Sequence, residues 1–399
     1  MPPPTRLTAE GLIASFCPDA PAFVSAFRDT PGTTVVFGNG EVDRTGVLAR
    51  NLKAERVLVV TDRGIADAGH LDRVVASLSA AGLEWSAFMG VIENPTTDTV
   101  DACVASARAC QADFLIGLGG GSSMDTAKGC NFLLTNGGAM KDYWGSGKAT
   151  QPMLPSIAIP TTAGTGSEMQ SYALISDAIT HAKMACGDRK AAARIAILDP
   201  ALTFSQPARV TALTGIDAIA HAIESAVSRN HSETSLAYSR TAFALLARAF
   251  PRVLADPGDA EARAAMLLGA ALAGTAIENS MLGAAHSAAN PLTAHLGTLH
   301  GEAVGLLLPH VVRLNSANPS AAATYRSLES AAALPAGSLP DFLTGLLASA
   351  SLPSQIEFPD SLLPALATMA AAQWTAQFNP VPVTADDFTG LYSAARSRN

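Results

Sequence analysis

Short apolar runs recur through the first half of the chain and alternate with helical patterns. Val57–Thr61 and Phe114–Leu118 are almost continuously apolar, which is typical of strands buried on both faces of a parallel sheet. Thr33–Phe37, Ser156–Ile159 and the alternating segment Ala193–Leu198 add further strands. These runs, with helices between them, predict an α/β domain built on a parallel sheet.

From about Ser205 onward the strand-like runs disappear and Ala- and Leu-rich patterns with helical spacing take over. The predicted helices are Ala208–Ser228, Ser232–Ala255, Ala260–Ala285 and Glu302–Leu314. Most of them are expected to pack into one all-α domain. A chain of this length is expected to hold two domains, so we divide it into an N-terminal extension (1–31), an α/β domain (32–204) and an all-helical domain (205–399).

The composition indicates a globular protein and argues against several other classes of protein. Of 399 residues, 48% are hydrophobic and 15% charged, so a large core is available. The net charge of −8 argues against nucleic-acid binding, which requires a basic surface. No apolar run approaches the thickness of a bilayer, and the N-terminus lacks the features of a signal peptide. Five cysteines without metal-site spacing indicate reduced thiols, so we expect a cytoplasmic protein without membrane or nucleic-acid partners.

A glycine triplet follows the predicted strand that ends at residue 118. Gly119, Gly120 and Gly121 allow a sharp turn and a close approach of the backbone to a ligand. Ser122 and Asp125 fit the S-x-x-D pattern that caps a helix start, and a helix that begins there directs free N–H groups toward a pyrophosphate. A triplet of glycines alone is common in strand-to-helix turns. Together, the strand, the glycines and the capped helix favour phosphate binding.

Asp62 stands at the end of the strand predicted at Val57–Thr61. An acid at the carboxyl end of a strand in a nucleotide-binding sheet can accept hydrogen bonds from a ribose hydroxyl and repel a 2′-phosphate. It can equally serve as the N-cap of a helix over Gly64–Ala68. The pattern of residues leaves both roles open.

The segment LTGIDAIAHAIES, at Leu213–Ser225, places Asp217 and His221 four residues apart in a helical pattern. Residues at this spacing lie one turn apart on the same side of a helix, so this carboxylate and imidazole can bind one divalent cation. The alternative is a half-buried histidine beside an acid that the helix dipole stabilises. The pair by itself does not exclude that structural role.

Two further histidines strengthen the metal interpretation. His286 is expected at the end of an Ala-rich helical run that Pro291 should break or kink, and His300 opens the next helical pattern. Two helix ends joined by a loop can bring these histidines against the helix that carries Asp217 and His221. Three imidazoles and one carboxylate suit Fe(II) or Zn(II) better than Mg²⁺ or Ca²⁺.

These motifs together resemble the iron-containing (group III) alcohol dehydrogenase family. D-x-x-x-H followed by H-x13-H stands downstream of GGGSSMDTAK and PTTAGTGSE, in the order of the family. The resemblance extends from about Thr33 to the C-terminus. It implies the dehydroquinate synthase-like fold, with an α/β N-terminal dinucleotide-binding domain and an all-α C-terminal metal-binding domain.

The resemblance also implies roles for individual residues. It implies that the cation is held by Asp217, His221, His286 and His300. It implies cofactor contacts at Asp62, Asn94, Gly119, Gly120, Gly121, Ser122, Asp125, Thr161, Thr162 and Lys183. In this family an acid at the position of Asp62 accompanies NAD(H) rather than NADP(H). Without the resemblance, Asn94 is a turn residue before a proline, and the threonines belong to a polar loop.

The expected reaction is the NAD-dependent interconversion of a small alcohol and its aldehyde or ketone in a cleft between the domains. The Fe(II) or Zn(II) ion acts as a Lewis acid on the alcohol oxygen, and hydride passes to the nicotinamide. The resemblance suggests a homodimer. Two alternatives stay open: a dehydroquinate synthase-like lyase with no net redox change, and a catalytically silent metal-binding protein.

One position departs from the family pattern. The family commonly has H-x-x-x-H-P, with a second histidine four residues after the first, but here that position is Asn290. Asparagine can form hydrogen bonds but does not titrate near neutral pH. If the family's histidine relays the alcohol proton or orients the substrate, this protein must differ in that step. His295 could take over that role, or it could be a solvated loop residue.

Overall fold

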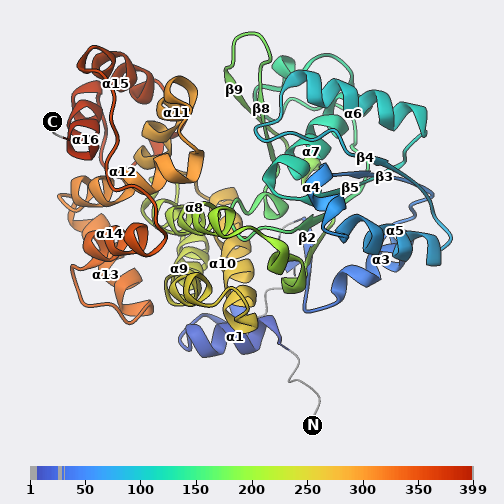
Figure 1. Cartoon of the computed structure of the whole chain (residues 1–399), viewed down its shortest axis with the longest axis horizontal. Helices are drawn as coiled ribbons and strands as arrows, with labels where there is room; N and C mark the ends of the chain where they lie inside the picture. The colour runs from blue at the N-terminus through green and yellow to red at the C-terminus, as the bar shows by residue number, and fades with distance from the viewer. Residues whose placement is uncertain (1–6, 26–28, 31, 398–399) are drawn as a thin grey trace. The chain divides into compact units, whose positions relative to one another are not determined.

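The computed structural model describes residues 7–25, 29–30 and 32–397 (Figure 1). Its contacts divide into two compact units. The first, here called the α/β unit, comprises most of the chain up to Gln206. The second, called the helical unit, holds Glu10–Ser25, Ala163–Thr165 and the chain from Pro207 onward. The predicted order, an α/β part followed by a helical part, is confirmed.

The α/β unit is built on a seven-stranded sheet with the strand order β1-β2-β10-β7-β5-β3-β4. Its strands are β1 (Asp29–Thr30), β2 (Thr33–Phe37), β3 (Arg56–Val60), β4 (Glu84–Phe88), β5 (Phe114–Gly119), β7 (Ser156–Pro160) and β10 (Ile195–Leu198). All pair in parallel except β1, which runs antiparallel to β2 at the edge. A small second sheet has the order β6-β9-β8, formed by Gly145–Ser146, Lys183–Gly187 and Tyr172–Ser176.

Strand β5, which lies between β7 and β3, shows why an apolar run forms a strand in this sheet. Successive side chains of a strand point to opposite faces, and Leu115 packs in the apolar cluster of one face while Phe114 and Ile116 pack in the cluster of the other. Helices cover both faces, so both sets of side chains are buried. The helices of this unit are α3 (Thr45–Asn51), α4 (Arg63–Asp67), α5 (His70–Ala80), α6 (Thr97–Ala109) and α7 (Gly121–Asn136).

The helical unit packs its longest helices around α8 (Ala208–Val227). The helices that follow are α9 (Glu233–Ala255), α10 (Ala260–Glu278), α11 (Ala284–Leu296), α12 (His300–Asn315), α13 (Pro319–Ala331), α14 (Leu339–Ser349), α15 (Leu363–Ala371) and α16 (Ala385–Ala395). Helices α9, α10 and α12 all contact α8. Much of α8 is therefore buried on every side, including its polar residues.

Glycines allow α12 to approach α8 closely. A Cβ on Gly301 would lie 2.3 Å from the carbonyl oxygen of Leu213, and one on Gly305 would lie 2.5 Å from Cγ2 of Ile216. Both distances are too short for a real side chain, so these positions require glycine. The first of them directly follows His300, and the close approach brings this histidine to the helix of Asp217 and His221.

The expectation that no apolar run is long enough to cross a membrane is corrected by two helices. By length and composition, α8 and α10 could each cross a membrane, although no apolar run of that length was expected. In the structure, 83% and 89% of their most apolar stretches are buried inside the protein. Their apolar character is therefore explained by the core of the helical unit.

Part of the N-terminal extension packs on the helical unit. The short helices α1 (Ala9–Phe16) and α2 (Ala22–Ser25) lie in the residues before the sheet. The guanidinium of Arg248 stacks over the Phe16 ring at 5.2 Å and donates to the Phe16 carbonyl at 2.8 Å. Arg240 pairs with Asp19 at 2.6 Å. These contacts attach the extension to α9.

Candidate functional site

Three imidazole nitrogens surround one carboxylate oxygen in the helical unit. The Nε2 atoms of His221, His286 and His300 lie 3.5, 3.4 and 3.8 Å from Oδ1 of Asp217. The His221 and His286 rings stack with centroids 4.9 Å apart, and the His286 and His300 centroids are 5.3 Å apart. The structure thus brings together the four residues expected to hold a cation.

The site is buried, and two of the polar atoms at its centre lack hydrogen bonds. Asp217, His221 and His286 are each no more than 5% exposed. Among the described residues, Oδ1 of Asp217 and Nε2 of His286 have no hydrogen-bond partner. Buried polar atoms normally have one, and the ligand atoms of these three residues all lie within 4.8 Å of one another. The arrangement fits a divalent cation, and its nitrogen-rich donor set suits Fe(II) or Zn(II).

The electrostatics of the cluster also favour positive charge at its centre. Burial would raise the pKa of Asp217, but the three histidines lower this pKa well below its usual range. Burial lowers the pKa of His221. Burial also opposes the charged form of His286, yet Glu224 and Asp217 outweigh it and raise the pKa of His286 to about 9.

Glu224 is a member of this cluster that sequence analysis missed. Its Oε2 lies 2.5 Å from Nδ1 of His286, and its Oε1 accepts from the backbone N–H of Ala285 at 2.7 Å. Glu224 follows Asp217 by two helical turns in the segment IDAIAHAIES, so it lies on the same side of α8. This spacing is the signal in the sequence that could have identified Glu224. The partner of Glu224, His286, lies on another helix, α11.

The position of His286 differs from the expected one. It is the third residue of α11, not the end of an Ala-rich run, because α10 ends at Glu278 and a loop separates the two helices. Of the two expected effects of Pro291, a break or a kink, the break does not occur, since α11 continues through it to Leu296. A proline removes one backbone hydrogen bond, and here the surrounding packing maintains the helix without it. His300 does begin its helix, as predicted.

Asn290 lies one turn after His286 on α11 and is partly buried. Its Nδ2 donates to Oε1 of Gln373 at 3.0 Å, whereas its Oδ1 has no partner among the residues that the structure describes. His295 is exposed in the last turn of this helix, with Nε2 3.0 Å from Sδ of Met369. It is therefore a helical residue rather than a loop residue.

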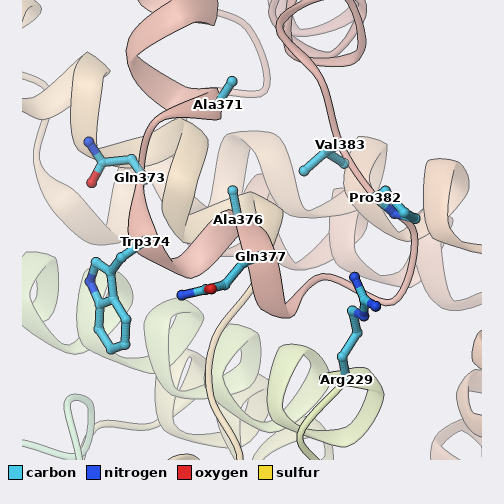
Figure 2. Close-up of a pocket in the computed structure, with 8 residues that line it drawn as sticks. All are labelled: Arg229, Ala371, Gln373, Trp374, Ala376, Gln377, Pro382 and Val383. Carbon is cyan, nitrogen blue, oxygen red and sulfur yellow. The ribbon is translucent and has the colours of Figure 1, made fainter.

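Gln373 also lines an open recess of about 410 Å³ in the helical unit. The remaining lining residues are Arg229, Ala371, Trp374, Ala376, Gln377, Pro382 and Val383. In the view of Figure 2 the indole of Trp374 and the guanidinium of Arg229 stand on opposite sides, with Gln377 between them. The segment that carries Gln373 and Trp374 contacts α11 at two points. Gln373 binds Asn290, and Thr375 shares a hydrogen bond of 2.7 Å with Ser287.

In the α/β unit, the glycine triplet forms the turn between β5 and α7. Gly119 has φ 139°, which favours glycine, and a Cβ there would lie 2.5 Å from Oγ of Ser123. The predicted S-x-x-D cap is wrong: the N-cap is Gly120, which offers no side-chain cap, and Ser122 lies inside the helix. The first N–H groups of α7 are therefore not capped by a side chain, as a phosphate-binding turn requires.

Asp125 has a different role from the predicted cap. Its Oδ1 accepts from Oγ of Ser167 at 2.7 Å and its Oδ2 from the N–H of Leu174 at 3.2 Å. Nζ of Lys128 donates to the carbonyl oxygen of Ser167 at 2.6 Å and to that of Tyr172 at 3.0 Å. This buried network ties α7 to the segment PTTAGTGSE and to the small sheet.

The other predicted cofactor residues occupy two places in the α/β unit. Thr161 is buried beside the triplet, and its N–H donates to the Gly119 carbonyl at 3.0 Å. Thr162 lies against Gly120, with its Oγ1 3.5 Å from the position of a Cβ on that glycine. Asp62 is the N-cap of α4 and accepts from the Ile65 N–H at 3.0 Å, so the capping role is confirmed.

Asn94 and Lys183 are the most exposed of the predicted cofactor residues. Asn94 is in a loop with φ 52°, a conformation that asparagine tolerates better than most residues. Lys183 begins β9, and its charge contributes to lowering the pKa of Asp125, a pKa that burial raises.

Comparison with known proteins gives consistent matches to one family. A family model described as iron-containing alcohol dehydrogenase matches residues 32–200, and one for the C-terminal part of the Fe-containing alcohol dehydrogenase family matches residues 211–396. The NAD-dependent methanol dehydrogenase of Bacillus methanolicus is 35% identical over 280 residues, covering 70% of this chain and 74% of that protein. The lactaldehyde reductase of Escherichia coli (strain K12) is 34% identical over 288 residues, covering 71% and 74%.

Solved structures of related enzymes share the fold. A crystal structure of 1,3-propanediol oxidoreductase superposes with a TM-score of 0.87 at 29% identity, covering 90% of this chain and 97% of that one. The sulfoacetaldehyde reductase of Bifidobacterium kashiwanohense in complex with NAD⁺ gives a TM-score of 0.85 at 26% identity, covering 93% and 98%. These matches confirm the predicted fold class and enzyme type: the chain belongs to the iron-containing alcohol dehydrogenase family of oxidoreductases.

Proposed function

We propose that this chain interconverts a small alcohol and its aldehyde or ketone with NAD(H), using Fe(II) or alternatively Zn(II). The observation that carries the proposal is the convergence of three histidine Nε2 atoms within 3.8 Å of one Asp217 oxygen. Relatives named for methanol, lactaldehyde and sulfoacetaldehyde support a small substrate that contains a hydroxyl or carbonyl group.

The ion would be held by Asp217, His221, His286 and His300. A bound Fe(II) or Zn(II) ion supplies Lewis-acid polarisation of the substrate oxygen, and NAD supplies the acceptor for hydride. Asp217 contributes the one negative charge of the donor set, and it is buried where its electrostatic effect is least screened by solvent.

Asn290 is proposed to orient the substrate. Its free Oδ1 can accept a hydrogen bond from a substrate hydroxyl, while its bond to Gln373 fixes the direction of the amide. Asparagine does not accept a proton near neutral pH. The proton that alcohol oxidation releases must therefore leave by another route, such as through water.

The dinucleotide is proposed to bind in the α/β unit. The uncapped N–H groups of α7 at Gly121 and Ser122 suit its pyrophosphate. The carboxylate of Asp62, at the end of β3, suits the adenosine ribose and disfavours a 2′-phosphate. The network of Asp125, and the contacts of Thr161 and Thr162 with the triplet, would fix the shape of this turn.

The test is an assay of absorbance at 340 nm, the NADH band, with protein reconstituted with Fe(II) or Zn(II). A panel of small alcohols with NAD⁺, and of aldehydes with NADH, is expected to give metal-dependent turnover. Absence of turnover with every substrate and either metal would contradict the proposal. It would favour a lyase, which shows no net redox change, or a silent metal-binding protein.

We further assign residues 32–204 to a dinucleotide-binding domain and 205–399 to a metal-binding domain, after the extension at 1–31. The family models over 32–200 and 211–396 support this division. A cytoplasmic homodimer is proposed as the working form, and all five cysteines are free thiols. Light scattering coupled to size-exclusion chromatography tests the dimer.

A further inference from the structure

Glu224 occupies a position between a candidate metal ligand and the start of a helix. It is 3% exposed and lies on α8 one turn beyond His221. One of its oxygens contacts Nδ1 of His286 at 2.5 Å, and the other accepts from the N–H of Ala285 at 2.7 Å. We propose that Glu224 is a positioning residue that fixes the tautomer and the orientation of His286 for metal binding.

The chemistry of the carboxylate sets the tautomer. An ionised carboxylate only accepts hydrogen bonds. Nδ1 of His286, which contacts Glu224, must therefore carry a proton and donate it. When the ring carries only this proton, the lone pair of Nε2 is directed toward Oδ1 of Asp217, 3.4 Å away. Two acceptors that face each other at this distance are complementary to a cation between them. This inference rests on the proposed metal site.

The same carboxylate also fixes the backbone that carries the ring. The N-cap of α11 is Gly283, which has no side chain to satisfy the first N–H groups of the helix. Asn379 Oδ1 accepts from Ala284 at 3.3 Å, and Glu224 Oε1 accepts from Ala285. Asn379 is itself fixed by two hydrogen bonds with the amide of Asn315, at 2.7 and 3.1 Å. Glu224 therefore determines both where α11 begins and how the His286 ring is turned.

A second buried acid of the helical unit shows what a purely structural role looks like. Glu329 is 2% exposed, and its two oxygens accept from the N–H groups of Gly337 and Leu339 at 2.7 and 2.8 Å. Both oxygens of Glu329 bind backbone, whereas Glu224 binds a candidate ligand with one of its two. Glu329 therefore provides a matched control for the loss of a buried acceptor.

Substitution of Glu224 by glutamine separates the two functions of the carboxylate. Glutamine has one acceptor oxygen, but Ala285 and His286 both require an acceptor here. If the oxygen serves Ala285, the amide NH₂ donates to Nδ1 and forces the histidine proton onto Nε2, where it opposes metal binding. If the oxygen serves His286, the NH₂ faces the Ala285 N–H and the start of α11 is disturbed. Both orientations weaken the site.

The test measures metal affinity directly, without turnover. The full-length protein is stripped of metal and titrated with Zn(II) and Co(II) in competition with a chelator, for wild type, Glu224→Gln and Glu329→Gln. We expect Glu224→Gln to weaken Zn(II) binding by about 10–100-fold and to alter the visible Co(II) spectrum. Glu329→Gln should lower the melting temperature while leaving both readouts at wild-type values. Wild-type affinity and spectrum in Glu224→Gln would overturn the inference.

A wild-type measurement covers the case in which Glu224→Gln does not fold. Long-range ¹H–¹⁵N spectra of the Zn(II)-loaded protein, with His286 assigned from the His286→Asn variant, should show a protonated Nδ1 and a metal-bound Nε2. A protonated Nε2 would overturn the role of Glu224 although the metal still binds. Failure of the wild type to bind Zn(II) or Co(II) would instead overturn the proposed metal site, and this inference with it.

Discussion

His286 and Asp217 meet across two helices with Nε2 and Oδ1 3.4 Å apart, both buried and neither hydrogen-bonded to another described group. Such a pair is costly in a protein interior unless a positive charge is shared between the two atoms. The His221 and His300 nitrogens approach the same oxygen. The geometry of the helical unit therefore fits a cation at this point, as proposed above.

The close approach of α12 to α8 can be tested by adding one methyl group. In Gly301→Ala the new Cβ would lie 2.3 Å from the Leu213 carbonyl oxygen, so one helix must shift. We expect a loss of roughly 1–3 kcal/mol in the free energy of unfolding and weaker metal binding through displacement of His300. Denaturant unfolding and Zn(II) titration measure both effects.

Gly390→Ala is the matched control for this substitution. Gly390 lies in α16, and nothing lies within 4 Å of the position of its Cβ. The change should be neutral or stabilise the protein by up to about 1 kcal/mol, because alanine favours helices. Equal losses of stability in the two variants would contradict the packing argument.

Asp62 is predicted to select NAD over NADP by its charge and not by its capping bond. Serine is also a good N-cap, so Asp62→Ser retains an acceptor for the Ile65 N–H while it removes the carboxylate. We expect kcat/KM for NADP⁺ to rise by roughly tenfold, which corresponds to about 1.4 kcal/mol, and that for NAD⁺ to fall. Asp67→Ser, an exposed acid of the same helix, should change neither value. An unchanged cofactor preference in Asp62→Ser would refute the ribose role.

Asn290→His introduces a titratable group one turn after His286. The wild-type pH profile of kcat should show no ionisation from this position. The histidine variant should gain an inflection near its ordinary pKa of about 6.5, because a histidine there can exchange a proton with the substrate hydroxyl. Asn290→Gln, which does not titrate, should keep the wild-type profile shape. Identical profiles for Asn290→His and wild type would indicate that this side chain does not reach the substrate.

Glu168, which lies in the α/β unit at the end of the segment PTTAGTGSE, gives a pH dependence of stability. Burial raises its pKa to about 7, although Lys128 partly opposes the shift. Since the folded-state pKa lies above the unfolded value of about 4.5, the folded protein binds more protons between these values and loses stability as the pH rises through them. By linkage the upper bound is about 3 kcal/mol.

Glu168→Gln removes this titration. We expect its melting temperature to exceed that of the wild type at pH 8, with the difference diminishing toward pH 5. Glu93→Gln, an exposed acid, should follow the wild type at every pH. A difference between Glu168→Gln and wild type that does not change with pH would refute the prediction.

The sequence was sufficient where local pattern determines structure. The change from strand-like runs to helical spacing near Ser205 marked the two kinds of unit, because the period of apolar residues is a local property. His300 at the start of its helix, and Asp217 and His221 one turn apart, followed from the same reasoning.

The sequence was insufficient where a distant partner determines structure. Ala-rich residues on both sides of the loop at 279–283 concealed the end of α10, so His286 was expected at the wrong end of a helix. The spacing of Asp125 matches that of a helix cap, but Ser167 and Leu174 donate to both of its oxygens instead. Glu224 was missed because its partner, His286, lies on a helix that only the tertiary structure brings near.

X-ray absorption at the metal edge of the Fe(II)- or Zn(II)-loaded protein shows whether three imidazoles and one carboxylate bind a single ion. We expect a shell of nitrogen and oxygen ligands with multiple scattering from three imidazoles. Removal of His221, His286 or His300 should each reduce that number by one or abolish binding. A wild-type shell with one imidazole or none, or with sulfur ligands, would show that Asp217, His221, His286 and His300 do not bind the ion together.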